Sequence, residues 1–354
     1  MNQKDQAELV GVKEIARRAN VSIATVDRVL HNRTGVSTKT KDKINAIIEE
    51  LDYQPNIMAR RLASKKVLHL AVLIPSISPE TDYWEAPLAG ILQAESEIKA
   101  YGIAVDKFFF DQNDKTSFRI QSKSLLKGNY DGVLLAPMFV DESKEFVEAC
   151  QKRGIPYIFI NSDVPNTNCL SYIGPDLYHS GYLGAHLASY LIGNGDRILV
   201  VNISQEMDNH HHLLRKEEGF RAYFEKNARI ADIVKLDIRN TDYLSVKMEL
   251  TRALDKGMVK LIFVTNSRVS AVARYLEEAR LEGIVLVGYD FIKENVDGLE
   301  KRKIDFLICQ KPQEQGYRGI MFLYNYLVQL IPVDRHYYMP IDIITRENYK
   351  YYKN

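Results

Sequence analysis

Apolar residues recur at helical spacing in three short segments of the first fifty residues. The segments are 12–19, 22–30 and 38–51, and each carries its apolar positions on one face. Only Asn20 and Val21 separate the first two segments, and Asn tolerates the left-handed backbone that so tight a turn requires. Because each helix is too short to be stable alone, the three are expected to share one small core, as in a helix-turn-helix domain.

From Val67 onward, apolar runs alternate with amphipathic segments. The runs predict strands at 67–75, 103–110, 131–137, 155–161, 169–174, 197–203, 230–238, 261–265 and 284–290. The amphipathic segments predict helices near 85–100, 116–127, 141–152, 176–192, 213–226, 243–255 and 268–282. This alternation predicts an α/β body of parallel sheets. So many strands are too many for one sheet, so we expect two doubly wound parallel-sheet lobes.

Polar residues gather where the predicted strands end. In doubly wound sheets, ligands bind outside the carboxyl ends of the strands. Two facing lobes would bring these polar residues into one cleft, which therefore predicts a site for a small polar ligand. The segments concerned are 76–83, 137–139, 161–163, 204–212 and 266–268, together with Asp290 and Gln310.

Charge is distributed unevenly along the chain, although the net charge is only +1. Residues 1–66 hold 13 Lys and Arg against 8 Asp and Glu, a balance of +5, and the remaining residues have a balance of −4. A basic head on a mildly acidic body is typical of a small nucleic-acid-binding module attached to a larger domain. A basic arm without a nucleic-acid partner would give the same charge balance.

Composition argues against membrane and secreted classes. Hydrophobic residues make up 46% and charged residues 26%, and no apolar run reaches the roughly 18 residues that a membrane-spanning helix needs. The start MNQKDQAELVG lacks the apolar core of a signal peptide. Cys150, Cys169 and Cys309 are odd in number and far apart, so we expect no disulfide framework and a reducing cytoplasm.

The sequence gives little support for a metal site or for an enzyme active site. Residues 210–212 are three consecutive histidines, which cannot easily all face one ion, and no nearby Cys or carboxylate completes a ligand set. The sequence lacks three motifs typical of enzymes and nucleotide-binding proteins. These are the phosphate-binding G-x-x-x-x-G-K-[ST], the dinucleotide-binding G-x-G-x-x-G after a strand, and the nucleophile motif G-x-S-x-G. The sequence predicts a binding protein that is not an enzyme and uses no metal or cofactor.

The order of these features resembles the lactose repressor/galactose repressor family of bacterial transcription regulators. The segment VKEIARRANVSIATVDRVLHNRTGVSTKTKDKINAIIEELDYQPNIMARRLA is similar to that family's DNA-binding headpiece and hinge, without a gap. The body resembles the type I periplasmic-binding-protein fold, which the family shares with sugar-binding transport proteins. The matching pieces are YWEAPLAGI, KGNYDGVLLAP, EEGFRAYF, VTNS, VGYD and QKPQEQG.

The resemblance implies a division of the chain into three parts. The helix-turn-helix domain would occupy 1–54, the hinge helix 55–66 and the ligand-binding body 67–354. Within the body, lobe 1 is expected at about 67–193 and 310–331, and lobe 2 at about 194–309 and 332–354.

The resemblance also implies that the second helix lies in the DNA major groove. Arg28 can fork onto O6 and N7 of a guanine, whereas Ile23 and Ala24 offer only apolar contact, for instance to a thymine methyl. The alternative for Arg28 is a surface salt bridge with Asp27 or Glu14. Gly11 stands where the family commonly has a capping Thr or Ser. The DNA-contacting positions implied in the head are Ser22, Ile23, Ala24, Thr25, Asp27, Arg28, His31, Asn32, Ser37, Thr38 and Tyr53.

In the resembling family, one hinge leucine from each of two subunits wedges into the minor groove and kinks the operator. Leu62 is the matching leucine, and Asn56, Ala59 and Arg60 match the rest of that hinge helix. An apolar helix docked on the body is the alternative. The DNA-binding geometry implies a homodimer on a pseudo-palindromic operator, because the two-fold symmetry of the protein is mirrored in its site.

The ligand site implied by the resemblance combines aromatic faces with polar side chains. Trp84 could instead be a core residue. Lys216 stands where the family usually has Arg, and Ser267 replaces the usual Asp after Asn266. The implied ligand-binding positions are Tyr83, Trp84, Asn161, Asp163, His210, Arg215, Lys216, Asn266, Asp290 and Gln310.

These observations lead to one main hypothesis. The chain is predicted to be a sequence-specific DNA-binding transcription regulator of the repressor type, located in the cytoplasm at the nucleoid. Its partners would be double-stranded operator DNA, a sugar or sugar derivative and a second copy of the chain, with no role for a membrane. The alternative is a sugar-binding transport or sensory protein without a DNA role, against which the attached head argues.

Overall fold

The computed structural model describes residues 11–30, 33–51, 53, 67–78, 82–205 and 211–354. The chain divides into two compact units, Met1–Ser64 and Lys65–Asn354, which we call the head and the body. Within the described part of the chain, no helix is long and apolar enough to cross a membrane.

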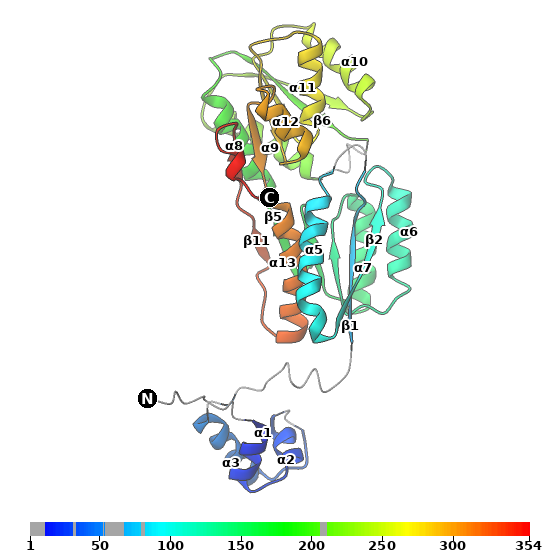
Figure 1. Cartoon of the computed structure of the whole chain (residues 1–354), viewed down its shortest axis with the longest axis vertical. Coiled ribbons are helices and arrows are strands. Elements are labelled where there is room, and N and C mark those ends of the chain that lie inside the picture. Colours follow the sequence, from blue (N-terminus) through cyan, green and yellow to red (C-terminus); the bar gives the residue numbers. More distant parts are fainter. Residues whose placement is uncertain (1–10, 31–32, 52, 54–66, 79–81, 206–210) are drawn as a thin grey trace. The chain divides into compact units, whose positions relative to one another are not determined.

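The head is the predicted set of three helices, α1 (Val12–Ala19), α2 (Ile23–Leu30) and α3 (Thr38–Glu50) (Figure 1). Asn20 adopts the left-handed conformation expected of the tight turn, with φ 56° and ψ 49°. The Ser22 hydroxyl accepts a hydrogen bond from the Thr25 amide (3.1 Å) and so caps α2, and Ser37 caps α3 in the same way. Gly11 supplies no side-chain cap to α1, as predicted.

One apolar cluster holds the three helices of the head together. Ile15, Val26 and Ile44 are fully buried at its centre, one from each helix. At the edge of this cluster, Lys43 Nζ donates a hydrogen bond to the carbonyl oxygen of Ala19 (3.0 Å), the last residue of α1. The head therefore has the shared core that its short helices require.

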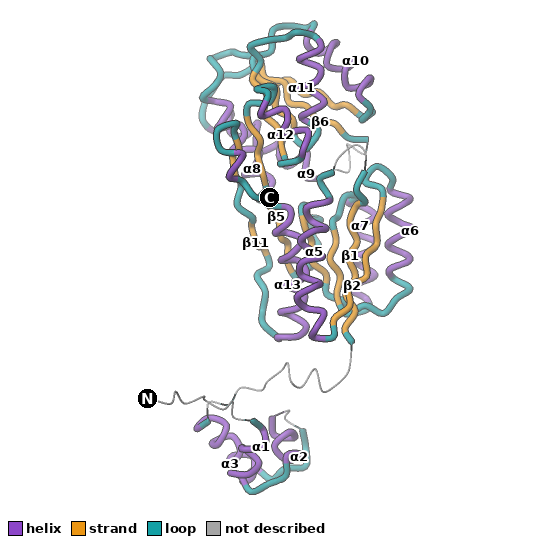
Figure 2. Tube along the Cα trace, viewed as in Figure 1, coloured by secondary structure: helices purple, strands orange, loops and turns teal. Residues whose placement is uncertain are grey.

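The body contains two sheets, shown as orange strands between purple helices in Figure 2. The first sheet has the order β11-β5-β4-β3-β1-β2 and is parallel throughout. The second has the order β12-β10-β9-β8-β6-β7 and is parallel except for the pair β10 and β12. The first sheet consists of β1 (Leu68–Pro75), β2 (Ile103–Phe110), β3 (Gly132–Leu135), β4 (Tyr157–Ile160), β5 (Ser171–Gly174) and β11 (His336–Tyr338). The second consists of β6 (Arg197–Ile203), β7 (Asp232–Ile238), β8 (Leu261–Val264), β9 (Val285–Tyr289), β10 (Phe306–Cys309) and β12 (Asp342–Ile344).

The strand sequences explain the layered arrangement. Central strands such as β3, β4 and β8 are buried along their whole length, so helices must cover both faces of each sheet. The helices are α5 (Glu85–Ile98), α6 (Lys115–Leu125), α7 (Val140–Lys152), α8 (Leu177–Ser189), α9 (His211–Lys226), α10 (Tyr243–Leu254), α11 (Val269–Glu278), α12 (Lys293–Glu300) and α13 (Pro312–Tyr324). The nine predicted strands and seven predicted body helices all have counterparts here, whereas β10, β11, β12, α12 and α13 lie outside the predicted set.

The predicted boundaries between the two lobes differ from the structure in two places. Helix α8 falls in the predicted lobe 1, yet Ala185 and Ala188 pack in the core of the second sheet with Phe220 of α9. Strand β11 falls in the predicted lobe 2, yet it pairs with β5 in the first sheet. The chain therefore crosses between lobes before α8, between β10 and α13, and after β11.

Two helix pairs approach closely through glycines, and Figure 1 shows one of them, α5 beside α13. A Cβ atom built on Gly90 of α5 would lie 1.9 Å from the carbonyl oxygen of Gln313 in α13. A Cβ on Gly181 of α8 would lie 1.8 Å from the carbonyl oxygen of Lys216 in α9. Only a residue without a side chain permits such backbone contact.

Candidate functional site

The predicted DNA-contacting side chains of the second helix form an exposed surface of the head. Ile23 is 49% exposed, and Ser22, Ala24 and Arg28 are exposed beside it, whereas Val26 faces the core. Ser37 and Thr38 are exposed at the start of α3, and Thr25, Asp27 and Tyr53 are partly buried. The N-terminal end of α2 thus presents amides and small side chains, which favour a phosphate.

The alternative salt bridges of Arg28, with Asp27 or Glu14, are not found among the described residues. Asp27 pairs with Arg33 (3.3 Å), and Glu14 pairs with Arg17 (2.6 Å) and with Arg18 (2.9 Å). Arg28 is exposed and makes no ion pair with another described residue. Its guanidinium is therefore available for a partner outside the head.

Several predicted positions lie outside the described residues, and so does the hinge helix predicted at 55–66. They are His31, Asn32, Asn56, Ala59, Arg60 and Leu62 for DNA and His210 for the ligand.

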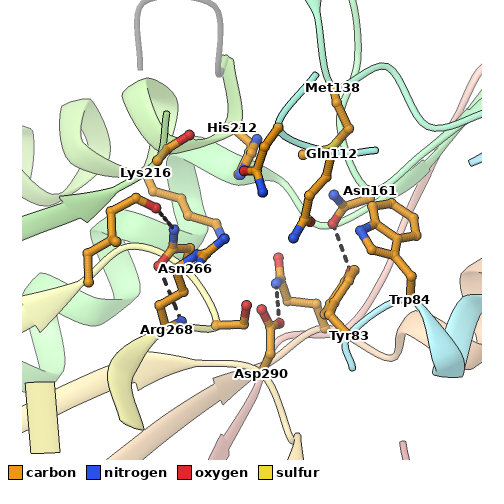
Figure 3. A pocket seen from close by; sticks show the side chains of 15 residues that line it. Tyr83, Trp84, Gln112, Met138, Asn161, His212, Lys216, Asn266, Arg268 and Asp290 are labelled. Atoms are coloured by element: carbon orange, nitrogen blue, oxygen red, sulfur yellow. Dashed lines mark hydrogen bonds between the residues drawn. The ribbon is translucent and has the colours of Figure 1, made fainter. Parts of the chain in front are cut away.

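The body has a pocket between its lobes, at the carboxyl ends of both sheets (Figure 3). Tyr83, Trp84, Met138 and Asn161 lie on one side of it, and Lys216, Asn266 and Arg268 on the other. The pocket has a cavity volume of about 60 Å³. Its lining is Tyr83, Trp84, Gln112, Asn113, Met138, Asn161, Ile203, Ser204, His212, Lys216, Asn266, Ser267, Arg268, Asp290 and Gln310.

The wall from the first lobe is neutral and partly aromatic. The rings of Tyr83 and Trp84 meet edge to face, with centroids 5.1 Å apart. The Tyr83 hydroxyl donates to the Asn161 side-chain oxygen (2.8 Å), and Asn161 follows β4 in a left-handed conformation, with φ 69°. Trp84 is 2% exposed, so it packs in the core and lines the pocket at once.

Asp290 and Gln310 form a pair at the ends of two adjacent strands in the second lobe. Asp290 follows β9 with φ 73°, and its Oδ1 accepts a hydrogen bond from Gln310 Nε2 (2.9 Å). Burial raises the pKa of Asp290, against the lowering effects of Lys216 and of this hydrogen bond. Gln310 Oε1 is buried and has no hydrogen-bond partner among the described residues.

Lys216 reaches the pocket from α9 although it is 3% exposed. Its Nζ donates to the carbonyl oxygen of Thr265 (3.2 Å) and lies 3.7 Å from the centre of the Tyr289 ring. Burial lowers the pKa of Lys216 to about 8, against the opposing effect of the Asp290 carboxylate.

Amide side chains behind the lining fix the strand ends. Asn295 is fully buried and donates to the carbonyl oxygens of Ser267 (2.9 Å), Tyr289 (2.9 Å) and Asp290 (3.0 Å). Gln315 accepts from the Asn161 amide (2.9 Å) and donates to the Gln310 carbonyl oxygen (2.8 Å), which ties together the two lobes. Asn266 is also anchored, because it donates to the Ile203 carbonyl oxygen (2.7 Å).

Two of the predicted ligand positions lie in a second pocket. Asp163 contacts His211 (3.3 Å), and Arg215 pairs with Glu218 and stacks over Tyr178 at 5.2 Å. These residues do not line the pocket described above, whereas seven of the ten predicted positions do. The second pocket is lined by Asp163, Tyr172, Pro175, Asp176, Leu177, Tyr178, His211, Arg215, His336 and Tyr338.

Some pocket residues are absent from the predicted set, although a signal existed for part of them. Gln112 and Asn113 follow β2, so the rule that ligands bind beyond strand ends also applies to them. Met138, Ser204, His212, Ser267 and Arg268 fall inside the predicted strand-end segments but are not among the predicted ligand positions. Asn295 and Gln315 lie on helices, and nothing in their sequence context marks them.

Asp82 makes a contact between the lobes beside this pocket. Its carboxylate accepts a hydrogen bond from the amide of Lys293, the first residue of α12, and its Oδ1 is buried without a partner in the described part of the chain. Burial raises the pKa of Asp82, and the neighbouring carboxylate of Glu294 adds to this effect. The charged form of Asp82 therefore opposes the observed contact between lobes.

We expect Asp82→Asn to raise the melting temperature at pH 7.5, because the variant carries no charge to oppose the contact. The advantage should shrink as the pH falls, since the raised pKa means that the wild-type carboxyl takes up a proton in the folded state before it would in the unfolded state. Thermal melts of both proteins at pH 7.5 and 4.5 check this. Glu282→Gln removes an exposed carboxylate and is the matched control. A constant difference at both pH values would contradict the expectation.

The head and the body each match a family of known proteins. Residues 11–56 match the model for bacterial regulatory proteins of the lacI family, and residues 71–329 match the model for the periplasmic binding protein domain. Catabolite control protein A of Priestia megaterium is 27% identical over 281 residues, which cover 79% of this chain and 74% of that protein. The same protein of Staphylococcus aureus strain N315 is 34% identical over 139 residues, covering 39% and 40%.

Solved structures agree with these matches. A chain assigned as a LacI transcriptional regulator from Bacteroides fragilis has a TM-score of 0.76 and 29% identity, covering 81% of this chain and all of that one. GanP, a glucose-galactose binding protein from Geobacillus stearothermophilus, has a TM-score of 0.71 at 20% identity, covering 80% and 99%, and thus shares the fold. The protein is a transcription regulator whose head is a DNA-binding domain of the lacI family type and whose body has the periplasmic-binding-protein fold. By the match over residues 71–329, the chain belongs to the periplasmic binding protein domain family.

Proposed function

We propose that this regulator is a homodimer of the repressor type whose affinity for operator DNA is controlled by a small carbohydrate-like ligand bound between its lobes. The observation that carries the proposal is the presence in one chain of an exposed recognition-helix surface and a polar pocket built by both lobes. The proposal places the protein in the cytoplasm, with its DNA, and assigns it no enzymatic activity.

The head would read DNA through few polar contacts. Arg28 has an available guanidinium, which can bind guanine O6 and N7, and exposed Ile23 and Ala24 can pack against thymine methyl groups. The phosphate contacts that would position the head come from Ser22, Thr25, Ser37, Thr38 and Tyr53. The proposed surface also includes His31, Asn32 and the hinge residues Asn56, Ala59, Arg60 and Leu62.

A two-fold symmetric dimer would match a pseudo-palindromic operator, with one head in each half-site. Ligand binding would favour the closed arrangement of the lobes, and the change in operator affinity could be no larger than the difference in ligand affinity between the two states. This coupling requires that the residues that line the pocket come from both lobes, as they do here.

The pocket suits a small ligand that carries both apolar faces and hydroxyls. Tyr83 and Trp84 offer apolar surface for the carbon face of a sugar, and Asn161, Asp290 and Gln310 offer partners for hydroxyls. The fold shared with GanP, which is named as a glucose-galactose binding protein, supports this ligand class.

The direct test uses the full-length protein and an operator selected from random DNA. Fluorescence anisotropy should show salt-dependent, sequence-specific binding by a dimer, and a thermal-shift screen of sugars and sugar derivatives should give a compound that raises the melting temperature. Adding that compound to the operator complex should change the operator Kd. Binding that does not distinguish the selected operator from random DNA would reject the proposal.

The shared fold with transport binding proteins supports one competing function, a sugar-binding transport or sensory protein. Such a protein would bind sugar with no effect on DNA affinity, so the operator titration with and without sugar separates the two.

A further inference from the structure

Two pocket residues, Asp290 and Gln310, are each followed by a residue that packs on the same tyrosine ring. Phe291 meets the ring of Tyr352 with centroids 4.8 Å apart. Lys311 places its Nζ 4.0 Å from the centre of that ring. Asp290 and Gln310 are themselves joined by a hydrogen bond (2.9 Å). Tyr352 therefore contacts the residues that follow both members of this pair, although it is not part of the pocket lining.

Lys311 has a backbone conformation that favours glycine. Its φ is 53° and its ψ 55°, and it lies between β10 and α13, where the chain crosses from the second lobe to the first. Asp290, at the end of β9, is also left-handed, with φ 73°. Such a conformation costs free energy in a residue that carries a Cβ atom, and it persists where surrounding contacts hold it. The pocket pair therefore depends on contacts made behind it.

The side chain of Lys311 ties the crossover to the segment 342–353. Its Nζ donates to the carbonyl oxygen of Lys353 (2.8 Å) and lies 3.3 Å from Asp342 Oδ2. The face of the Tyr352 ring completes the surroundings of the ammonium group, as in other cation–π contacts. A glycine at position 311 would adopt the same backbone conformation at lower cost but could make none of these contacts.

The Tyr352 ring belongs to the second lobe. Tyr349 and Tyr352 pack, partly buried, against the apolar core of the second sheet. Burial raises the pKa of Tyr352, and Cys309 and the carboxylates of Asp342 and Asp290 add to this effect. The phenol therefore stays neutral, and its ring is a fixed apolar support beside the ends of β9 and β10.

We propose that Tyr352 is a positioning residue for the ligand pocket, whose ring holds Phe291 and Lys311 and through them the pair Asp290 and Gln310. The inference rests on the proposed function, because it assigns the pair to ligand binding. Tyr352 itself touches no ligand. Without its ring, the crossover at Lys311 is held less firmly, so the lobes separate more readily and water reaches the pocket.

The first test needs no ligand, because Trp84 is the only tryptophan of the chain, lines the pocket and is 2% exposed. In full-length Tyr352→Ala, the emission of Trp84 should shift to longer wavelength and its quenching by acrylamide should increase. Tyr352→Phe should match the wild type, since both contacts are made by the ring. Tyr351→Ala is the matched control, because Tyr351 is 85% exposed. Circular dichroism verifies folding. Wild-type quenching in Tyr352→Ala would overturn the inference.

The second test uses Lys311→Gly, which separates the side-chain contacts from the backbone conformation. If only the conformation mattered, glycine would preserve the pocket, whereas we expect Trp84 quenching to increase. Arg302→Gly is the matched control, because Arg302 is also a left-handed cation, with φ 57°, but is exposed and lies outside the pocket. Quenching that stays at the wild-type value in Lys311→Gly would show that the Tyr352 ring does not act through this lysine.

The third test measures binding of D-glucose and D-galactose, the sugars in the name of GanP, by calorimetry. Tyr352→Ala should bind them about tenfold more weakly than the wild type, and Tyr352→Phe should bind them equally well. Wild-type affinity in Tyr352→Ala rejects the positioning role and leaves the sugar-controlled regulator standing. If neither sugar binds the wild-type protein, the proposed ligand class fails for these two sugars, and the quenching of Trp84 still decides the role of Tyr352.

Discussion

Gly181→Ala is expected to destabilise the body by about 3 kcal/mol, because the added methyl group meets backbone atoms that cannot rotate away. A Cβ at position 181 would lie 1.8 Å from the Lys216 carbonyl oxygen and 2.6 Å from its carbonyl carbon. The contact is reciprocal, because a Cβ on Gly219 of α9 would lie 1.9 Å from the Tyr178 carbonyl oxygen in α8. Relief requires the two helices to move apart along their shared interface.

The same substitution should weaken ligand binding, because the clash falls on the backbone of the residue that carries the buried ammonium. Urea denaturation followed by circular dichroism measures the loss of stability, and calorimetry measures the ligand. Gly193→Ala is the matched control, since its Cβ would find Asp196 Oδ2 at an ordinary 3.5 Å. Gly181→Ala and Gly193→Ala unfolding at the same urea concentration would show that α8 and α9 are not in such contact.

Arg28→Ala should weaken binding to the selected operator by about 1–3 kcal/mol in each half-site, which is the contribution of a bidentate contact with guanine. A dimer loses this twice, so the full operator should bind much more weakly while random DNA loses little. The structure supports the choice of residue, because Asp27 and Glu14, its alternative protein partners, are occupied by other arginines.

The measurement is anisotropy with the selected operator and with operators altered at one base of each half-site. Arg28→Ala should discriminate less at one position and bind the others in the original order of preference. Lys115→Ala, at an exposed position on the body, is the control for charge and should bind normally. A loss of equal size on every sequence would show that Arg28 contacts phosphate instead of a base.

Local periodicity in the sequence is sufficient to predict the helix-turn-helix head and nine strands of the body. These elements depend on contacts within a few residues, such as the left-handed Asn20 turn and the Ser22 cap, and on continuous apolar runs in buried strands. The rule that ligands bind beyond strand ends likewise selects Asn161, Asp290 and Gln310, which line the pocket between the lobes. The same rule also selects Gln112, which follows β2 and lines the same pocket.

Only the tertiary structure decided which neighbouring residue faces the pocket. Lys216 and Arg215 are consecutive on α9, and a helix turns successive side chains by about 100°, so Lys216 enters the pocket and Arg215 enters the second one. The tertiary structure also decided to which lobe each element belongs. Helix α8 and strand β11 join the sheet with which they make contacts to residues distant in sequence.

The sequence by itself thus determined the order and type of most elements and the class of protein, since these follow from residue spacing and from motifs read along the chain. The tertiary structure decided the glycine contact between α8 and α9, the anchoring by Asn295 and Gln315, and the burial of the Lys216 ammonium away from any carboxylate of the described residues. These features arise from atoms that meet across long stretches of chain. Burial and the distance to the nearest opposite charge are properties of that meeting and not of any single segment.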